Sequence, residues 1–276
     1  MNEHYPKISV IMPVYNGEDV IRYALNSLLW QTCEDWECII VNDGSTDGTK
    51  DILDSLSDTR FRIVHLVKNG GRGNARQKAL ELVRGKYIAF LDADDWYTPE
   101  KLKEQSDFLE KNQDVDLIGG AVLSYGNKSN IKTTRGAGTG KICIYRGGPL
   151  HLIHGNVMFR TAIADGVSYN TTYDYGEDED FMSRCLLNKA YTISDKIWYY
   201  YNELDSITIP KMRKATWEIF CRVRTVKHLL KYLFWCIIAP ILGIDYMIKR
   251  RGKTPTTEDI ERFEYLYAHL KHSLAE

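Results

Sequence analysis

Strands and helices alternate over the first hundred residues, and this alternation constrains the fold more than any other feature. Four apolar runs of strand length occur at residues 8–14, 36–43, 61–67 and 86–92. Segments of helical character separate them, at residues 17–31, 48–56 and 74–84. Strands that are apolar almost throughout and are joined by helices predict a mostly parallel sheet covered on both faces. We therefore expect an α/β fold.

The rest of the chain changes character at about residue 210. Before that point short strands mix with loops, and we expect strands at 116–125 and 142–145 and a helix at 177–189. From residue 211 onward the sequence is helical and basic. We expect one α/β domain over residues 1–210 and a basic helical extension over residues 211–276.

Composition and cysteine spacing disfavour several classes of protein. With 44% apolar and 26% charged residues, the chain of 276 residues is typical of a globular protein. Its six cysteines are scattered without C-x-x-C spacing, which favours neither a zinc cage nor a redox motif. The polar start MNEHYPK is not followed by a signal peptide, so we expect a cytoplasmic protein. We expect the run Tyr199–Tyr201 in the core, and no nucleic-acid partner.

Polar residues follow each of the four strands expected to be parallel. In strand order they are Tyr15 and Asn16, Asn42 and Asp43, Asn69 to Gly73, and Asp92 to Asp95. Ligands of open α/β sheets bind outside the carboxyl ends of the strands. Four polar loops in succession therefore predict a binding cleft at this edge of the sheet.

Two groups of acids lie far apart in the sequence. Asp92, Asp94 and Asp95 fall within four positions directly after a strand, and like charges this close raise one another's pKa unless something neutralises them. Such a cluster suits Mg²⁺ or Mn²⁺ held by one or two carboxylates and by ligand phosphates. The second group, GEDEDF at 176–181, lies at a predicted helix start, where acids interact favourably with the helix dipole.

Five motifs, in order and correctly spaced, resemble the family-2 inverting glycosyltransferases, which have the GT-A fold. They are ISVIMPVYNGE, VNDGSTDGT, GRGNARQKAL, YIAFLDADD and GEDEDF, and the resemblance covers about residues 5–210. It implies a donor half over about residues 1–100 and an acceptor half over about 101–210. It also implies a nucleotide-sugar donor (a UDP-sugar above all), Mn²⁺ or Mg²⁺, and a glycan or lipid-linked glycan acceptor of the bacterial cell envelope.

The resemblance implies a set of donor-binding residues. They are Pro13, Val14, Tyr15, Asn16, Asp43, Arg76, Asp92 and Ala93. The first four would line the nucleoside, and Asp43 would hydrogen-bond the base. Arg76 would lie beside the nucleotide, and Asp92 would face the ribose.

The resemblance also implies the residues that carry the chemistry. Asp94 would hold the metal on the diphosphate, and Asp178 would act as general base with Glu177 or Asp180 in support. This arrangement agrees with the reaction. A single displacement needs charge neutralisation on the leaving diphosphate and a proton acceptor on the opposite face of the sugar. The strand GNVMFR at 155–160 resembles the family strand beside the acceptor pocket.

Two other functions stay open on the sequence. Nucleotidyltransferases of similar fold also need a metal carboxylate pair, but they usually bring a basic residue after the first strand, where this chain has PVYNGEDV. An inactive transferase-like scaffold is the other alternative. One departure from the family bears on activity. Tyr201 and Glu203 stand about where many members carry an Arg and a His in a loop over the diphosphate.

The basic segment 211–253 suggests a neighbour of opposite charge. It holds eleven Lys or Arg and two acids, a net charge of +9, although the whole chain carries −1. The apolar run 232–244 is too short to span a bilayer, so we expect peripheral contact with the anionic inner face of the cytoplasmic membrane. The alternative is that these helices pack on the catalytic domain or on a second subunit of a homo-oligomer.

Overall fold

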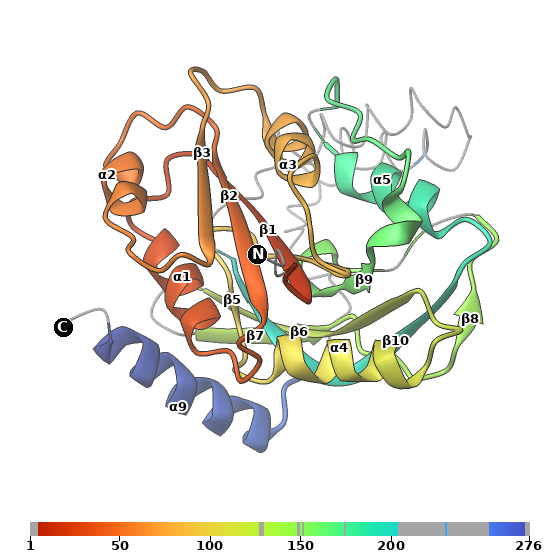
Figure 1. Cartoon of the computed structure of the whole chain (residues 1–276). Coiled ribbons are helices and arrows are strands. Elements are labelled where there is room, and N and C mark those ends of the chain that lie inside the picture. The colour runs from red at the N-terminus through yellow and green to blue at the C-terminus, as the bar shows by residue number, and fades with distance from the viewer. Residues whose placement is uncertain are drawn as a thin grey trace.

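A computed structural model of the chain describes residues 5–126, 130–147, 150, 152–173, 175–203, 230 and 254–273. Figure 1 shows one twisted sheet with helices packed on both of its faces. The strands are β1 (Ile8–Val14), β2 (Trp36–Asn42), β3 (Phe61–His65), β4 (Tyr87–Phe90), β5 (Trp96–Tyr97), β6 (Leu117–Gly126), β7 (Asn130–Arg135), β8 (Cys143–Ile144), β9 (Met158–Arg160) and β10 (Ala190–Asn202). The helices are α1 (Ile21–Leu29), α2 (Thr49–Asp54), α3 (Arg72–Leu80), α4 (Lys101–Lys111), α5 (Glu177–Leu186) and α9 (Thr257–His272), with the short 3-10 helices η2 (His154–Asn156) and η3 (Thr161–Ala164).

The parallel half of the sheet agrees with the sequence prediction. The sheet runs in the order β3-β2-β1-β4-β9-β6-β10-β5, with β7 beside β6 and β8 beside β10. Strands β3, β2, β1 and β4 are parallel to one another. Strand β9 is antiparallel to both β4 and β6, which makes the whole sheet mixed. The carboxyl ends of the first four strands therefore meet at one edge, as predicted.

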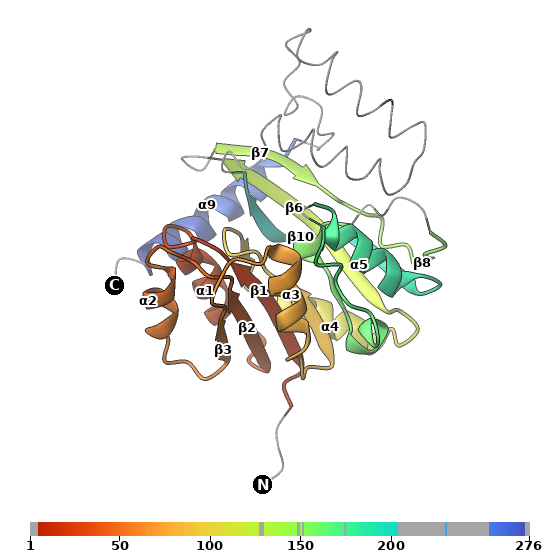
Figure 2. The ribbon, with the colours of Figure 1, turned by 90° about the horizontal axis from the view of Figure 1, so that it is seen from above.

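Alternate residues of β1 enter cores on opposite faces of the sheet. Val10 and Met12 pack in a cluster with residues of α1, α2 and α4, whereas Ile11 packs in a cluster with residues of α3 and α5. Burial on both faces explains why these strands are apolar almost throughout, because each side chain meets a helix whichever way it points. The arrangement places α3 and α5 side by side on one face (Figure 2).

The C-terminal helix α9 packs on the α/β domain. Phe263 is fully buried and lies in a cluster with Trp96 of β5, Tyr125 of β6 and Tyr200 of β10. On α1, Tyr23 stacks on Tyr267 with ring centroids 5.9 Å apart. The expected membrane contact of residues 211–253 lies outside the described residues, apart from position 230. Among the described residues, no helix has the length and apolar character needed to cross a bilayer.

A buried acid at the amino end of the sheet ties three segments together. Glu37 on β2 accepts hydrogen bonds from Ser9 Oγ at 2.7 Å, from Arg62 Nη1 at 2.8 Å and from Arg84 Nη2 at 2.8 Å. Burial raises the pKa of Glu37, but the hydrogen bonds from Arg84, Ser9 and Arg62 outweigh burial and hold the pKa below its ordinary value of 4.5. The ionised carboxylate is therefore the form that stabilises the fold.

We expect Glu37→Gln to lower the free energy of unfolding by about 1.5–3 kcal/mol at pH 7, the scale for hydrogen bonds to charged groups. A lowered pKa in the folded state gives stability that is present above pH 4.5 and lost as pH falls through the folded value. The difference between variant and wild type in the free energy of unfolding, measured by urea denaturation, should therefore be smaller at pH 3 than at pH 7. Glu110→Gln, which removes a half-exposed ion-pair partner, should cost less than about 1 kcal/mol. A gap independent of pH would contradict this account.

Candidate active site

The loops that follow β1 and β2 are joined by Asn16. Its backbone N–H donates to Ser45 Oγ at 2.9 Å, and its side-chain Oδ1 accepts from the Thr46 N–H at 2.9 Å. Asn16 has φ +50°, a left-handed conformation that asparagine tolerates better than most residues. The neighbouring Tyr15 is 50% exposed. The segment Pro13–Asn16, predicted to line a nucleoside, therefore ends in a fixed turn that presents an aromatic ring.

Asp43 joins the loop after β2 to the loop after β3. The side chain is buried, and its two oxygens accept from the N–H groups of Gly70 at 2.9 Å and Gly71 at 2.8 Å. The adjacent Gly44 has φ +70°, and a Cβ there would lie 2.6 Å from the Lys68 carbonyl carbon. Only glycine fits so close an approach of the two loops. Asp43, predicted to bind a base, thus also fixes the start of α3.

The three acids after β4 have three different environments. Asp92 is 33% exposed and accepts from Arg76 Nη2 at 2.8 Å. Asp95 is fully buried, and its oxygens accept from Tyr199 Oη at 2.6 Å and from the Asn202 N–H at 2.7 Å. Asp94 is partly buried, and within the described part of the chain no other residue hydrogen-bonds its carboxylate or pairs with it. Asp94 is therefore the acid of this loop that is open to a ligand.

The electrostatics of this loop fit a hard divalent cation. Burial and the negative charge of Asp92 together raise the pKa of Asp94 to about 6, against the weaker opposite effects of Arg72 and Arg76. A bound cation would relieve this crowding of like charges. In the residues the structure describes, no group of three or more His, Cys, Asp or Glu could hold a metal ion. The protein would thus contribute one or two carboxylates, and ligand phosphates would supply further oxygens.

Arg76 joins the loop after β4 to the start of α5. Its side chain is 3% exposed; Nη2 donates to Asp92 and Nη1 donates to Glu177 Oε1 at 2.7 Å. Burial alone would lower the pKa of Arg76, but Asp92, Tyr169 and Glu177 raise it above its ordinary value. Arg76 is predicted to lie beside the nucleotide. In the structure this buried side chain contacts the carboxylate of Asp92, which is the more exposed of the two.

The acids at the start of α5, like those after β4, differ in their burial and in their partners. Glu177 is 3% exposed and is held by Arg76, while Asp180 pairs with Arg184 at 2.7 Å. The partly buried carboxylate of Asp178 accepts a hydrogen bond from the Glu179 N–H at 2.8 Å. No cation in the described ranges forms a salt bridge with Asp178. Of these acids, Asp178 best meets the requirements of a proton acceptor.

His154 completes the connection between the two acid groups. Its ring lies against Phe90 at the end of β4, with centroids 3.8 Å apart, and Nε2 is 3.1 Å from Tyr169 Oη. Tyr169 in turn stacks on Phe181 of α5 at 4.0 Å. Burial lowers the pKa of His154 to about 3, and the charge of Arg76 acts in the same direction. His154 is therefore neutral near pH 7 and braces β4 against α5.

Comparison with known proteins identifies the family. The family model described as Glycosyl transferase family 2 matches residues 9–168, more than half of the chain. The chain belongs to this family. It is a glycosyltransferase, and its sheet with flanking helices is the GT-A fold, as the resemblance predicted.

Relatives and solved structures agree with this assignment. The chain is similar to the putative teichuronic acid biosynthesis glycosyltransferase TuaG of Bacillus subtilis (strain 168), with 31% identity over 84% of this chain and 99% of TuaG. It is also 31% identical to the poly(ribitol-phosphate) beta-glucosyltransferase of Bacillus spizizenii, over 71% of this chain and 32% of that enzyme. The crystal structure of S. aureus TarS 1-349 in complex with UDP matches with a TM-score of 0.60 and 26% identity, over 78% of this chain and 65% of TarS 1-349.

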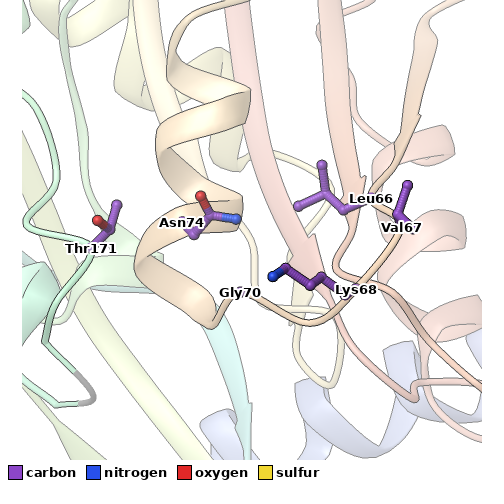
Figure 3. A pocket seen from close by; sticks show the side chains of 6 residues that line it. All are labelled: Leu66, Val67, Lys68, Gly70, Asn74 and Thr171. Atoms are coloured by element: carbon purple, nitrogen blue, oxygen red, sulfur yellow. The ribbon is translucent and has the colours of Figure 1, made fainter.

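Some features of this glycosyltransferase site had no signal in the sequence. His154, Tyr169 and Tyr199 reach it through contacts between elements far apart in the chain. A pocket of about 330 Å³ lies beside the start of α3 (Figure 3). Gly70 of the predicted polar loop lines it, but none of the predicted donor-binding, catalytic or metal residues does. Two predicted features have other environments. At Glu203, one of the two positions (with Tyr201) where the chain departs from the family pattern, the side chain forms an ion pair with Arg135 at 2.9 Å.

Ala93, predicted to bind the donor, is largely buried.

Proposed function

We propose that this glycosyltransferase moves a sugar from a UDP-sugar to a hydroxyl of a glycan or lipid-linked glycan, with inversion in a single displacement. The observation that carries the proposal is the double ion pair of Arg76. It brings the loop of Asp92 and Asp94 beside the start of α5, where Asp178 lies. TarS 1-349 has been crystallised with UDP and with UDP-GlcNAc, which supports this class of donor.

The geometry supports separate roles for the two acid groups. Inversion requires the acceptor to attack from the side opposite the leaving diphosphate, so the base must come from a different segment than the diphosphate site. Asp178, which forms no salt bridge with a cation of the described residues, would take the proton of the acceptor hydroxyl. Asp92, oriented by Arg76, would accept hydrogen bonds from the ribose. Glu177 would act as a buried support for the helix that carries Asp178.

Asp94 would hold Mn²⁺ or Mg²⁺ in this proposal, with Asp92 close by. Bound there, the cation would neutralise charge on the leaving diphosphate as a Lewis acid. Asp95 would keep the loop in place through Tyr199 and Asn202.

The proposal is tested by incubating the enzyme with a panel of nucleotide sugars and Mn²⁺. Release of a nucleoside diphosphate supports glycosyl transfer. Release of pyrophosphate from a nucleoside triphosphate and a sugar phosphate would instead support a nucleotidyltransferase. Nucleotide binding without turnover of any donor would support an inactive scaffold.

We expect Asp94→Ala to weaken Mn²⁺-dependent binding of UDP by about 10-fold or more. Loss of a residue that only orients a metal ligand typically lowers metal affinity by about 10-fold or more, and loss of the ligand itself should cost at least as much. Titration calorimetry of UDP with and without Mn²⁺ is the measurement. Asp165→Ala, which changes an exposed acid outside this loop, serves as control and should bind like wild type. Wild-type affinity in a folded Asp94→Ala protein would remove Asp94 from the metal site.

A further inference from the structure

Two arginines of α3 lie next to the acid groups, and they differ in how firmly they are held. Arg76 is buried and is engaged by both Asp92 and Glu177 at 2.7–2.8 Å. The side chain of Arg72 is 60% exposed. Its one salt bridge within the described residues joins Nε to Glu177 Oε1 over 3.7 Å, and that oxygen already accepts from Arg76. Arg72 is thus a cation with little to hold it in place.

Four acids (Asp92, Asp94, Glu177 and Asp178) and two arginines (Arg72 and Arg76) surround this site, so a diphosphate there would bind together with a divalent cation. Arg76 pairs with both Asp92 and Glu177, whereas Asp94 and Asp178 have no paired cation among the described residues. The cations that act electrostatically on Asp94 are Arg72 and Arg76. A diphosphate bound with a cation at Asp94 would therefore meet Arg72, which among the described residues is an exposed and weakly held arginine beside this site.

The backbone places Arg72 for such a contact. It is the first residue of α3, and the N-cap, Gly71, has φ +87° and provides no side-chain cap. The Gly71 N–H is held by Asp43, which fixes where the helix begins. One residue on, a Cβ at Gly73 would lie 3.7 Å from the Glu177 side chain, so the start of α3 lies against the start of α5. The positive end of the α3 dipole adds to the charge of Arg72.

We propose that Arg72 is a further donor-binding residue, whose guanidinium contacts the diphosphate of the nucleotide sugar and neutralises its charge as it leaves. This inference rests on the proposed function and assigns it a second source of positive charge besides the metal. Guanidinium is suited to this contact, since its planar fork of N–H groups matches two phosphate oxygens at once.

Titration calorimetry with Mn²⁺ tests the proposal, with UDP and uridine as probes. We expect Arg72→Gln to weaken UDP binding by about 10-fold or more, the scale of a hydrogen bond to a charged group. Uridine binding should change less than about twofold, because uridine has no phosphate. The UDP affinity of Arg72→Lys should fall between that of wild type and that of Arg72→Gln, because lysine keeps the positive charge but lacks the planar fork of N–H groups. Lys78→Gln, which removes a half-exposed cation at the other end of α3, should match wild type.

The possible results separate this inference from the proposed function. Wild-type UDP affinity in Arg72→Gln, with normal binding by the wild-type enzyme, would overturn the role of Arg72 alone. Equal loss of UDP and uridine binding would also overturn it, because the residue would then support the nucleoside site. If wild type binds no UDP and releases none from any donor, the proposed function fails and this role fails with it.

Discussion

Asp178→Asn is expected to lower turnover by about 10²–10⁴-fold, the scale for losing general-base catalysis, while UDP affinity stays near that of wild type. Asparagine keeps the shape of the side chain and can still accept the hydrogen bond from the Glu179 N–H. It cannot take a proton from the acceptor hydroxyl. The measurement is the release of UDP from the donor that the panel identifies, together with calorimetry of UDP binding.

The comparison with neighbouring acids makes the assignment specific. Glu179→Gln changes an exposed acid in the same helical turn and should leave turnover near wild type. Glu177→Gln removes a buried partner of Arg76, so its defect should appear first in stability. A folded Glu177→Gln enzyme without activity, beside an active Asp178→Asn enzyme, would show that the base is misplaced by one residue.

Arg76→Leu is expected to lower the free energy of unfolding by about 3–5 kcal/mol, because it leaves a buried carboxylate without its cation. Glu177 is the main source of this cost, since its side chain is 3% exposed and Asp92 can still reach water. Urea denaturation measures the effect. Arg262→Leu removes a half-exposed arginine paired with Glu100 at 2.7 Å, and should cost less than about 1 kcal/mol.

The Asp92 part of this stabilisation depends on pH. Burial raises the pKa of Asp92, but the charge and hydrogen bond of Arg76 and the charge of Arg72 bring it below its ordinary value of 3.8. The contribution is therefore present above pH 3.8 and is lost as pH falls through the folded value. A loss under about 1 kcal/mol in Arg76→Leu at pH 7 would mean that water or another residue replaces the arginine.

The parallel half of the fold could be predicted from the sequence because its signals are local. Strands β1, β2, β3 and β4 begin within one residue of their predicted starts, since burial on both faces leaves an unbroken apolar run in each. The ends of these strands agree less well with the prediction. Strand β4 stops at Phe90, not at residue 92, because the chain turns there and the Asp95 N–H donates to the Asp92 carbonyl. The order of the motifs was enough to identify the family.

The antiparallel part of the sheet depended on tertiary structure. Strand β9 lies within GNVMFR, which the resemblance marked as a strand, but its three residues are too few to show a period. Its pairing with β4 on one side and β6 on the other is visible only in the structure. The helical character of α9 is visible in the sequence, but its position is not. Only the structure shows that α9 packs against Trp96, through the aromatic cluster around Phe263.

Tertiary structure also decided which of the acids have partners within the protein. The resemblance implies separate roles for Asp92, Asp94 and Asp178, but the local sequence does not tell Asp95 from its two neighbours or Glu177 from Asp178. Asp95 is made structural by Tyr199, which is 104 positions away, and Glu177 is made structural by Arg76, which is 101 positions away. A short sequence motif determines which residues carry charge, whereas burial and a partner from a distant segment determine which charge is neutralised and which is left for a ligand.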